Sequence, residues 1–268
     1  MLEHETWAVT GAAGAVASGL RAGIAARVGR LRLLDLRVVA PVHANEESLA
    51  VDLRDQTGME TALSGTHGLL HLGGLADEAD FHDLAAVDIV GTFHALEAAR
   101  RAGARRVVYA SSNRGTGFYD TDTCLTPELP PRPDGLYGAS KIAGEALARV
   151  YADKFGLEVA CIRIGSYETA PRDVRQLSTW LSPADCLRAF LAAMTTEPLG
   201  FATFYGVSAN TRRWWSLAPG RALGYEPRDD AEGYADALAA AQAGTTPGPQ
   251  GGVYATPAYT LDRQRPSG

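Results

Sequence analysis

Short apolar runs alternate with longer amphipathic stretches through the first two thirds of the chain. A short apolar run bounded by turn residues favours a buried strand, whereas apolar positions recurring every three or four residues favour a helix. This alternation is typical of βαβ units, in which helices cover a parallel sheet. It predicts strands over residues 7–10, 31–36, 49–53, 69–72, 106–111 and 159–164.

Helices are expected in the longer stretches between these strands. An Ala-rich helix should follow Gly14, a long helix should cover roughly residues 81–102, and another should cover 136–155. The pattern thus predicts an α/β fold with a Rossmann-like, doubly wound parallel sheet.

After Ser166 the alternation breaks into shorter units. Ser182 and Pro183 mark a helix start, because serine caps the first turn and proline fits within it. A late strand is expected over residues 203–207 and a loop over 245–249. We therefore expect one domain over residues 1–268, in which 167–268 contribute a small C-terminal substrate-binding cap.

Composition and charge narrow the class of protein. Of the 268 residues 46% are hydrophobic and 21% charged, and the net charge is -6. Such a chain carries no basic field, so no nucleic-acid partner is expected. No apolar stretch is long enough to cross a bilayer, so no membrane partner is expected either, and the first residues lack the pattern of a signal peptide. Three widely spaced cysteines without CxxC indicate reduced thiols, and we expect a cytoplasmic protein.

A glycine turn lies where the first strand gives way to the first helix. Gly11 and Gly14 would let the backbone approach a pyrophosphate at the N-terminus of that helix, and the small Ala17 replaces a third glycine. Asp35 closes the second strand, where a carboxylate can bind the adenosine ribose and repel a 2'-phosphate. The turn predicts a dinucleotide site that favours NAD; the alternative is a tight turn without a ligand, and Arg37 could weaken the preference.

Further residues at the ends of the strands complete the expected cofactor site. Asp52 and Leu53 would lie beside the adenine, and the paired Gly73 and Gly74 would let the chain pass close to the cofactor; ordinary turn chemistry is the alternative for both pairs. The whole expected set is Gly11, Ala13, Gly14, Ala15, Val16, Asp35, Leu36, Asp52, Leu53, Leu72, Gly73, Gly74, Tyr137, Lys141 and Ile164.

The candidate catalytic residues come from two segments. Tyr137 and Lys141 are four residues apart and share one face of a helix. A phenol ordinarily has a pKa near ~10, and an adjacent ammonium favours its ionised form, so such a tyrosine can act as a base. Ser112, at the end of the fifth predicted strand, can orient the reacting oxygen. Together these residues predict transfer of a hydride from a hydroxyl-bearing carbon to NAD. No metal site is expected, because His71 and His94 lack the spacing of metal ligands and suit packing.

These motifs resemble those of the extended short-chain dehydrogenase/reductases. Within that group, several stretches along almost the whole chain resemble the uronate dehydrogenases: 111–113, 132–138, 163–166, 177–180, 208–210, the pair Trp214 and Trp215, and 251–252. The resemblance implies an enzyme that oxidises the anomeric hydroxyl of galacturonate or glucuronate to an aldarolactone with NAD. The two tryptophans fit core or subunit packing better than sugar stacking.

The resemblance also implies a substrate site and an assembly. Arg175 would bind the substrate carboxylate, although from its own surroundings it could be a surface arginine, and Asn113 and Ser166 would bind sugar hydroxyls and the carboxylate. The expected substrate site comprises Ala76, Ser112, Asn113, Arg114, Tyr137, Ser166 and Arg175. The protein is expected to bind a small sugar acid and to form a homo-oligomer through its long helices.

Three positions depart from the family pattern. Ala76 replaces a serine, Arg114 a histidine, and Asp88 an asparagine that supports the lysine through water. These changes leave the hydride chemistry intact and leave the identity of the acid open. The alternatives are a sugar-nucleotide epimerase or dehydratase, which the short stretch after Ser166 disfavours, a dehydrogenase of another sugar acid, and a non-catalytic NAD-sensing protein.

Overall fold

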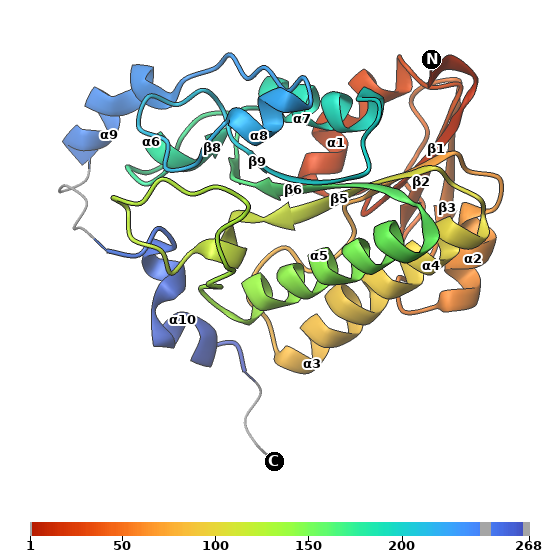
Figure 1. Ribbon diagram of the computed structural model, residues 1–268, viewed down its shortest axis with the longest axis horizontal. Helices are drawn as coiled ribbons and strands as arrows, with labels where there is room; N and C mark the ends of the chain where they lie inside the picture. The colour runs from red at the N-terminus through yellow and green to blue at the C-terminus, as the bar shows by residue number, and fades with distance from the viewer. Residues whose placement is uncertain (1, 242–247, 265–268) are drawn as a thin grey trace.

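The computed structural model describes residues 2–241 and 248–264 (Figure 1). Its centre is a parallel seven-stranded sheet in the order β3-β2-β1-β4-β5-β6-β9. The strands are β1 (Thr6–Thr10), β2 (Arg30–Asp35), β3 (Glu46–Ala50), β4 (Gly68–His71), β5 (Arg106–Ser112), β6 (Glu158–Ile164) and β9 (Phe201–Gly206). The order reverses between β1 and β4, and ligands bind beyond the carboxyl ends of the strands at such a point. The expected Rossmann-like α/β fold is confirmed.

Helices cover both faces of the sheet. On one face α1 (Ala15–Ala25) packs against α7 (Pro183–Thr195), and their apolar side chains join one buried cluster that includes Leu20, Ile24 and Phe190. On the other face lie α2 (Gln56–Leu63), α4 (Gly91–Arg101) and α5 (Leu136–Phe155), which enclose a second cluster. In Figure 1 α4 and α5 run side by side below the sheet.

The long helix expected over residues 81–102 has an irregular middle. It consists of α3 (Phe81–Leu84), a π-helical turn η2 (Ala85–Val90) and then α4. A π turn inserts one extra residue into a helix and often marks a functional site. Here the turn contains Asp88, whose side chain is fully buried. Hydrophobic periodicity does not reveal this turn, because the residue that the turn buries is the charged Asp88, whereas Val90 is exposed.

Two sequence expectations need correction. The third strand is Glu46–Ala50 rather than 49–53, because Leu49 pairs with Leu34 in an edge strand and the apolar run then leaves the sheet, with Leu53 packing beneath α4. The boundary at residue 167 does not separate body from cap. Both α7 and β9 follow it, and both belong to the main body, since β9 pairs with β6.

Short elements connect and extend this body. They are η1 (Leu2–His4), η3 (Asn113–Thr116), β7 (Ser166–Tyr167), α6 (Gln176–Thr179), β8 (Trp180–Leu181), α8 (Ala218–Ala222), η4 (Ala231–Tyr234), α9 (Ala235–Ala241), η5 (Gly252–Ala255) and α10 (Pro257–Leu261). Of the loop expected over 245–249, residues 245–247 lie outside the described residues. None of the helices in the described part of the chain has the length and apolar character needed to cross a membrane.

Candidate active site

The glycine turn connects β1 to α1 and packs tightly against the turn after β4. Gly11 has a φ of 66°, and a Cβ atom there would lie 2.8 Å from the Cα of Gly73. Both features require glycine. The turn is held by the carboxylate of Asp35, which accepts a 2.9 Å hydrogen bond from the backbone N–H of Ala13. No side chain caps α1 at Gly14, so its first N–H groups remain available to an anion.

A cavity of about 400 Å³ lies beside this turn. It is lined by seven of the expected cofactor residues: Gly11, Asp35, Leu36, Asp52, Leu53, Gly73 and Gly74. The Asp52 carboxylate is bound by Arg54, and this hydrogen bond holds the pKa of Asp52 below its usual range. Three others, Val16, Leu72 and Ile164, line a neighbouring cavity instead, whereas Ala13 and Gly14 form the turn itself and Ala15 begins α1.

The two histidines considered as ligands have packing roles. His71 Nδ1 lies 2.8 Å from Thr10 Oγ1, and His71 Nε2 lies 3.1 Å from Thr92 Oγ1. Burial lowers the pKa of His71 to about 3, so the ring is neutral. His94 lies against the carbonyl of Leu53. Among the described residues no group of His, Cys, Asp and Glu is arranged to hold a metal ion.

The three candidate catalytic residues meet in the neighbouring cavity, which measures about 370 Å³. Lys141 Nζ lies 5.5 Å from the ring centroid of Tyr137, one helical turn away on α5. Ser112 comes from the end of β5. The adjacent Ser111 donates its hydroxyl to Glu145, so its proton is already engaged. The Ser112 oxygen only accepts a bond from the N–H of Arg114, so its own proton remains available to a substrate.

Asp88 approaches Lys141 from the π turn. Its Oδ2 lies 3.9 Å from Lys141 Nζ, and its Oδ1 accepts a 2.7 Å hydrogen bond from the N–H of Leu75. Although burial disfavours the ammonium, the nearby Tyr109 and Asp88 raise the pKa of Lys141 above its usual range. The lysine is therefore a stable cation next to Tyr137.

Glu78 fixes the start of α5. Its carboxylate accepts hydrogen bonds from the N–H groups of Leu136 (2.8 Å) and Tyr137 (3.1 Å), 58 and 59 residues away in the sequence. A carboxylate at a helix N-terminus satisfies donors that the helix leaves open and complements its dipole. Glu78 thus holds the turn that carries the candidate base. Nothing local in the sequence indicated this contact.

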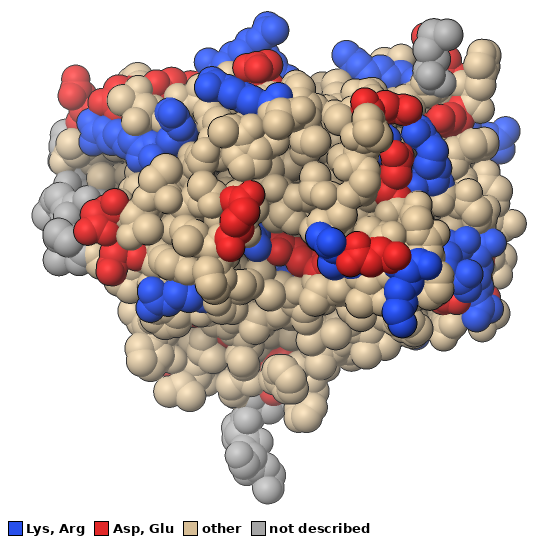
Figure 2. All heavy atoms as spheres, viewed as in Figure 1, with Lys and Arg blue, Asp and Glu red and all other residues tan. Residues whose placement is uncertain are grey.

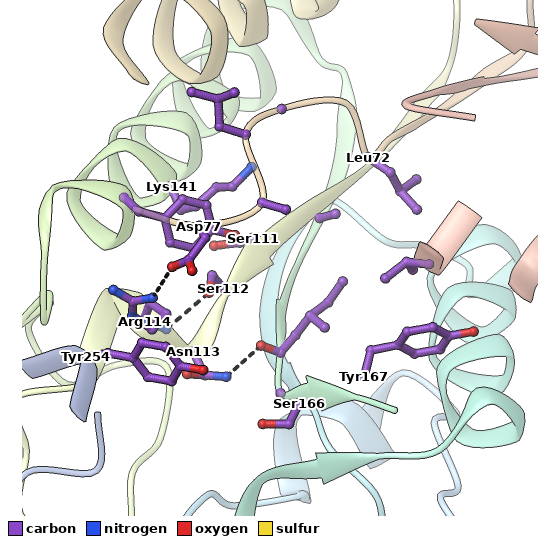
Figure 3. Close-up of a pocket in the computed structure, with 18 of the residues that line it drawn as sticks. Leu72, Asp77, Ser111, Ser112, Asn113, Arg114, Lys141, Ser166, Tyr167 and Tyr254 are labelled. Carbon is purple, nitrogen blue, oxygen red and sulfur yellow. Dashed lines mark hydrogen bonds and ion pairs between the residues drawn. The ribbon is translucent and has the colours of Figure 1, made fainter. Parts of the chain in front are cut away.

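All seven expected substrate residues line the 370 Å³ cavity: Ala76, Ser112, Asn113, Arg114, Tyr137, Ser166 and Arg175. Figure 3 shows Asp77, Arg114 and Tyr254 on one side of it and Ser166 and Tyr167 on the other. Asn113 donates to the carbonyl of Ile164 (2.9 Å), which ties β5 to β6. Sequence reasoning missed several lining residues, among them Asp77, Tyr167, Glu168, Gln176 and Tyr254. Only their position in the fold reveals them.

Arg114 is the more heavily paired of the two arginines in this cavity. Its guanidinium binds Asp134, lies 3.0 Å from Asp77 Oδ1 and lies 3.4 Å from Glu78 Oε2. Asp134 and Asp77 hold the pKa of Arg114 above its usual range in spite of burial. Asp134 is itself buried, and its Oδ2 has no hydrogen-bond partner. Burial raises the pKa of Asp134 to about 6, although Arg114 opposes this shift.

Arg175 is paired differently. Its Nε donates a 2.6 Å hydrogen bond to the carbonyl of Gln250, and no ion pair joins it to any described carboxylate. Burial lowers the pKa of its guanidinium. The local sequence allowed a surface arginine here, but the structure places Arg175 in the wall of the cavity that contains Tyr137.

Trp215 stacks on Tyr205, with 5.0 Å between the ring centroids, and is 1% exposed, so its packing role is confirmed.

Comparison with known proteins agrees with this geometry. The model of the NAD dependent epimerase/dehydratase family matches residues 7–181. The uronate dehydrogenase of Pseudomonas putida is 37% identical over 92% of this chain and 94% of its own length. The solved glucuronic acid dehydrogenase of Chromohalobacter salexigens has a TM-score of 0.91 at 37% identity, covering 96% of this chain and 99% of its own.

A third relative bears on the cofactor. It is a mutant uronate dehydrogenase of Agrobacterium tumefaciens, solved in complex with NAD, with a TM-score of 0.89 and 38% identity. The match covers 94% of this chain and 97% of that one. The family match and this likeness agree with the NAD preference predicted from the glycine turn and Asp35. With the sheet order, the glycine turn and the Tyr137–Lys141 pair in place, this chain belongs to the NAD dependent epimerase/dehydratase family.

Proposed function

We propose that this chain is an NAD-dependent uronate dehydrogenase, which oxidises the anomeric hydroxyl of galacturonate or glucuronate to an aldarolactone. One observation carries the proposal. Arg175, a guanidinium without a carboxylate partner among the described residues, lines the same cavity as Ser112, Tyr137 and Lys141. An arginine binds a carboxylate through two parallel hydrogen bonds, so this cavity suits a sugar that carries an acid group. The uronate and glucuronic acid dehydrogenases among the relatives support the same substrate class.

The residues present fit NAD. The N-terminus of α1 and the turn at Gly11 would hold the pyrophosphate, Asp35 the hydroxyls of the adenosine ribose, and Lys141 the nicotinamide ribose. Of the other expected cofactor residues, Leu36, Asp52 and Leu53 would enclose the adenine. The nicotinamide would be enclosed by Val16, Leu72, Gly73, Gly74 and Ile164. When bound, NAD accepts the hydride that the substrate loses.

The proton is handled by Tyr137. Its phenolate removes the proton of the anomeric hydroxyl, and the neighbouring Lys141 ammonium stabilises that phenolate. Ser112 donates a hydrogen bond to the same substrate oxygen and orients it. The C–H bond breaks with its electron pair leaving as the hydride, the O–H bond breaks with its proton passing to Tyr137, and the carbon–oxygen double bond of the lactone forms.

The other end of the sugar faces Arg175. Asn113 and Ser166 offer hydrogen bonds to hydroxyl groups or to the carboxylate, whereas Ala76 offers none. Arg114 borders the cavity, but Asp77, Glu78 and Asp134 neutralise it, so Arg175 supplies the charge that recognises the acid. Without such a partner the carboxylate would lose several kcal/mol on leaving water.

The test is the efficiency ratio kcat/KM for uronate over the matching neutral sugar. Arg175→Ala should cost about 2–5 kcal/mol for galacturonate or glucuronate and almost nothing for galactose or glucose. Arg175→Lys should recover part of the loss, because an ammonium cannot form the two parallel bonds. Arg212→Ala is the matched control, since Arg212 is exposed, pairs with Glu232 and lines neither cavity.

Each outcome of this test leads to a different conclusion about the substrate. If the ratio is unchanged in Arg175→Ala, Arg175 does not bind the carboxylate and the same substitution is made at Arg114. If neither arginine matters, the uronate proposal is wrong, and the chain is a dehydrogenase of another substrate.

We also propose that the protein forms a homo-oligomer through α4 and α5. Figure 2 shows few charges over the N-terminal halves of these helices, whereas charged residues gather toward their C-terminal ends. Large apolar side chains are exposed along these helices: Val90 directly before α4, Phe93 in the first turn of α4, and Val150 in the C-terminal half of α5. Light scattering should report a multiple of the 28.3 kDa chain mass, and Phe93→Glu should reduce it.

The remaining proposals concern the cap and the compartment. The segments after β7 that do not join the main sheet face the substrate cavity through Arg175, Gln176 and Tyr254, and we propose that they form the substrate-binding cap. We propose a cytoplasmic location, which suits an enzyme that draws on NAD and whose three cysteines are unpaired. Fractionation of the native cells would test it.

A further inference from the structure

The chain segment from Gln250 to Gln264 closes the substrate cavity from the outside. Gln250 begins it and is 1% exposed. Its side chain donates to the carbonyls of Asp120 (3.0 Å) and Thr123 (2.9 Å) and accepts a 2.8 Å bond from Trp215 Nε1. All the hydrogen-bonding groups of this amide are therefore used within the body of the protein. The backbone carbonyl of the same residue binds Arg175.

The far end of the segment is fastened to a different part of the chain. Tyr259 donates its hydroxyl to Asp77 Oδ2 (2.5 Å), and Thr260 donates to Glu78 Oε1 (3.1 Å). Gln264 donates to the carbonyl of Ala79 and accepts from the N–H of Phe81. These partners lie about 180 residues earlier, in the loop after β4 that separates the two cavities. The segment is thus held at both ends.

Tyr254 lies between these two attachments and faces the cavity (Figure 3). Its ring centroid is 4.3 Å from the guanidinium carbon of Arg114 and 5.4 Å from that of Arg175. Two guanidinium groups in one cavity repel each other, and Arg114 contributes to lowering the pKa of Arg175. Arg114 is compensated by three carboxylates. Arg175 has the carbonyl of Gln250 and the π face of Tyr254.

We propose that Tyr254 is a specificity-determining positioning residue, which holds Arg175 as a desolvated, correctly oriented cation for the acid group of the substrate. The inference rests on the proposed function and deepens it. Gln250 fixes the Nε side of the guanidinium through its carbonyl, and the Tyr254 ring supports its plane, so the terminal nitrogens are left for the carboxylate. A cation on an aromatic face is stabilised more strongly when it is desolvated. The attachment of Tyr259 to Asp77 keeps the ring of Tyr254 in place, since the two rings meet edge to face at 4.9 Å.

The experiment compares substitutions that keep or remove the ring. Tyr254→Leu retains apolar bulk but has no π face, and it should raise KM for galacturonate or glucuronate about tenfold while leaving KM for NAD within about twofold. Tyr254→Phe keeps the ring and should restore the parent values. Tyr259→Phe removes the bond to Asp77 and should give an intermediate rise. Phe155→Leu is the matched control, because it breaks a comparable arginine–ring contact (Arg100, 5.1 Å) away from both cavities.

Four readouts make the result specific. Neutral sugars should be turned over equally by the parent and by Tyr254→Leu, since they do not use Arg175. In the double substitution of Tyr254→Leu with Arg175→Ala, the loss should equal that of Arg175→Ala alone, because the ring acts through the arginine. Thermal unfolding identifies a variant that is merely unfolded; if Tyr254→Leu does not fold, Tyr259→Phe carries the comparison, because a KM for uronates equal to that of the parent would then contradict the proposal. Binding of galacturonate to the NADH-loaded enzyme, measured by calorimetry, gives affinity without turnover.

The outcomes also distinguish this inference from the proposed function. If uronates depend on Arg175 but Tyr254→Leu leaves their KM unchanged, the positioning role is wrong and the proposed function stands. Equal losses for uronates and neutral sugars would likewise overturn it, since the ring would then merely shape the cavity. If the parent enzyme shows no preference for uronates over neutral sugars, the proposed function fails first.

Discussion

The two cavities of this protein are built in opposite ways. The cofactor cavity lies beyond the ends of neighbouring strands, and its lining combines glycines and aliphatic side chains with a few charged groups, among them Asp35 and the Asp52–Arg54 pair. The substrate cavity collects residues from the loop after β4, the end of β5, the start of α5, the β6–α6 region and the C-terminal segment. Arg114 there is held by the carboxylates of Asp77, Glu78 and Asp134, whereas Arg175 is held by the backbone carbonyl of Gln250. One site depends on chain geometry and the other on side-chain pairing.

This contrast explains what the sequence alone could predict. A strand, a glycine turn and a helix are contiguous, so Gly11 and Asp35 could be interpreted from the sequence alone. The Tyr137–Lys141 pair is local in the same sense. Glu78, by comparison, caps α5 from 58 residues away, and only folding brings it there. No spacing rule contains that contact.

The fold shows the same division. The parallel sheet and the ranges of most strands followed from the apolar pattern, because buried strands and amphipathic helices leave periodic signals. The pattern missed the π turn that carries Asp88, because the residue buried in this turn is charged and not apolar. It also misplaced β3, since this edge strand is partly exposed and its apolar run continues past the last pairing residue. Tyr254, in a short exposed segment, gave no periodic signal at all.

The largest effect is expected from substitutions at the border between the two cavities, where Tyr137 and Lys141 lie. Tyr137→Phe should lower kcat by about a hundredfold or more, because general acid–base catalysis contributes that much, while NAD affinity persists. Lys141→Ala should impair both kcat and NAD binding, since the lysine faces both partners. Steady-state kinetics and NAD titration measure the two effects. Near-normal kcat in Tyr137→Phe would contradict the mechanism.

A second test concerns the side-chain pairing of the substrate side. The pKa of Asp134 is about 6 in the folded protein, above its ordinary 3.8, so the folded state binds the proton more tightly. Stability contributed by this group is therefore greatest below about pH 4, declines as pH rises to about 6 and is constant above that. Relative to Asp134→Asn, the parent should lose about 2–3 kcal/mol over this interval.

Urea unfolding of both proteins between pH 4 and 7 checks this expectation. The comparison isolates Asp134, because other groups titrate alike in the two proteins. Asp153→Asn, at an exposed position of α5, serves as the control for removing a carboxylate away from the cavity. A difference in unfolding free energy that stays level with pH would mean that Arg114 fully compensates the burial of this carboxylate.

The smallest expected effect is on the cofactor side. The parent should use NAD at least about tenfold more efficiently than NADP, because the Asp35 carboxylate would face the 2'-phosphate at short range. Asp35→Ser should narrow that ratio and leave KM for the sugar acid unchanged, since no substrate-side residue depends on it. Equal use of both cofactors by the parent would indicate that Arg37 governs the choice. A changed KM for the sugar acid in Asp35→Ser would contradict the conclusion that the two cavities act separately.

The cluster around Arg114 also sets a limit on how this pocket can be redesigned. The uronate dehydrogenase pattern has a histidine at this position, yet Arg114→His alone would leave Asp77, Glu78 and Asp134 with little or no positive charge between them. Uncompensated buried charges are strongly destabilising. Asp77, the most exposed of the three carboxylates, is the one whose neutralisation disturbs the buried structure least. A library that randomises single positions would reject most changes at Arg114, whereas one that varies positions 77 and 114 together would give access to new acids. Substitutions at positions 77 and 114 are therefore epistatic, and the two positions have to be varied as a pair.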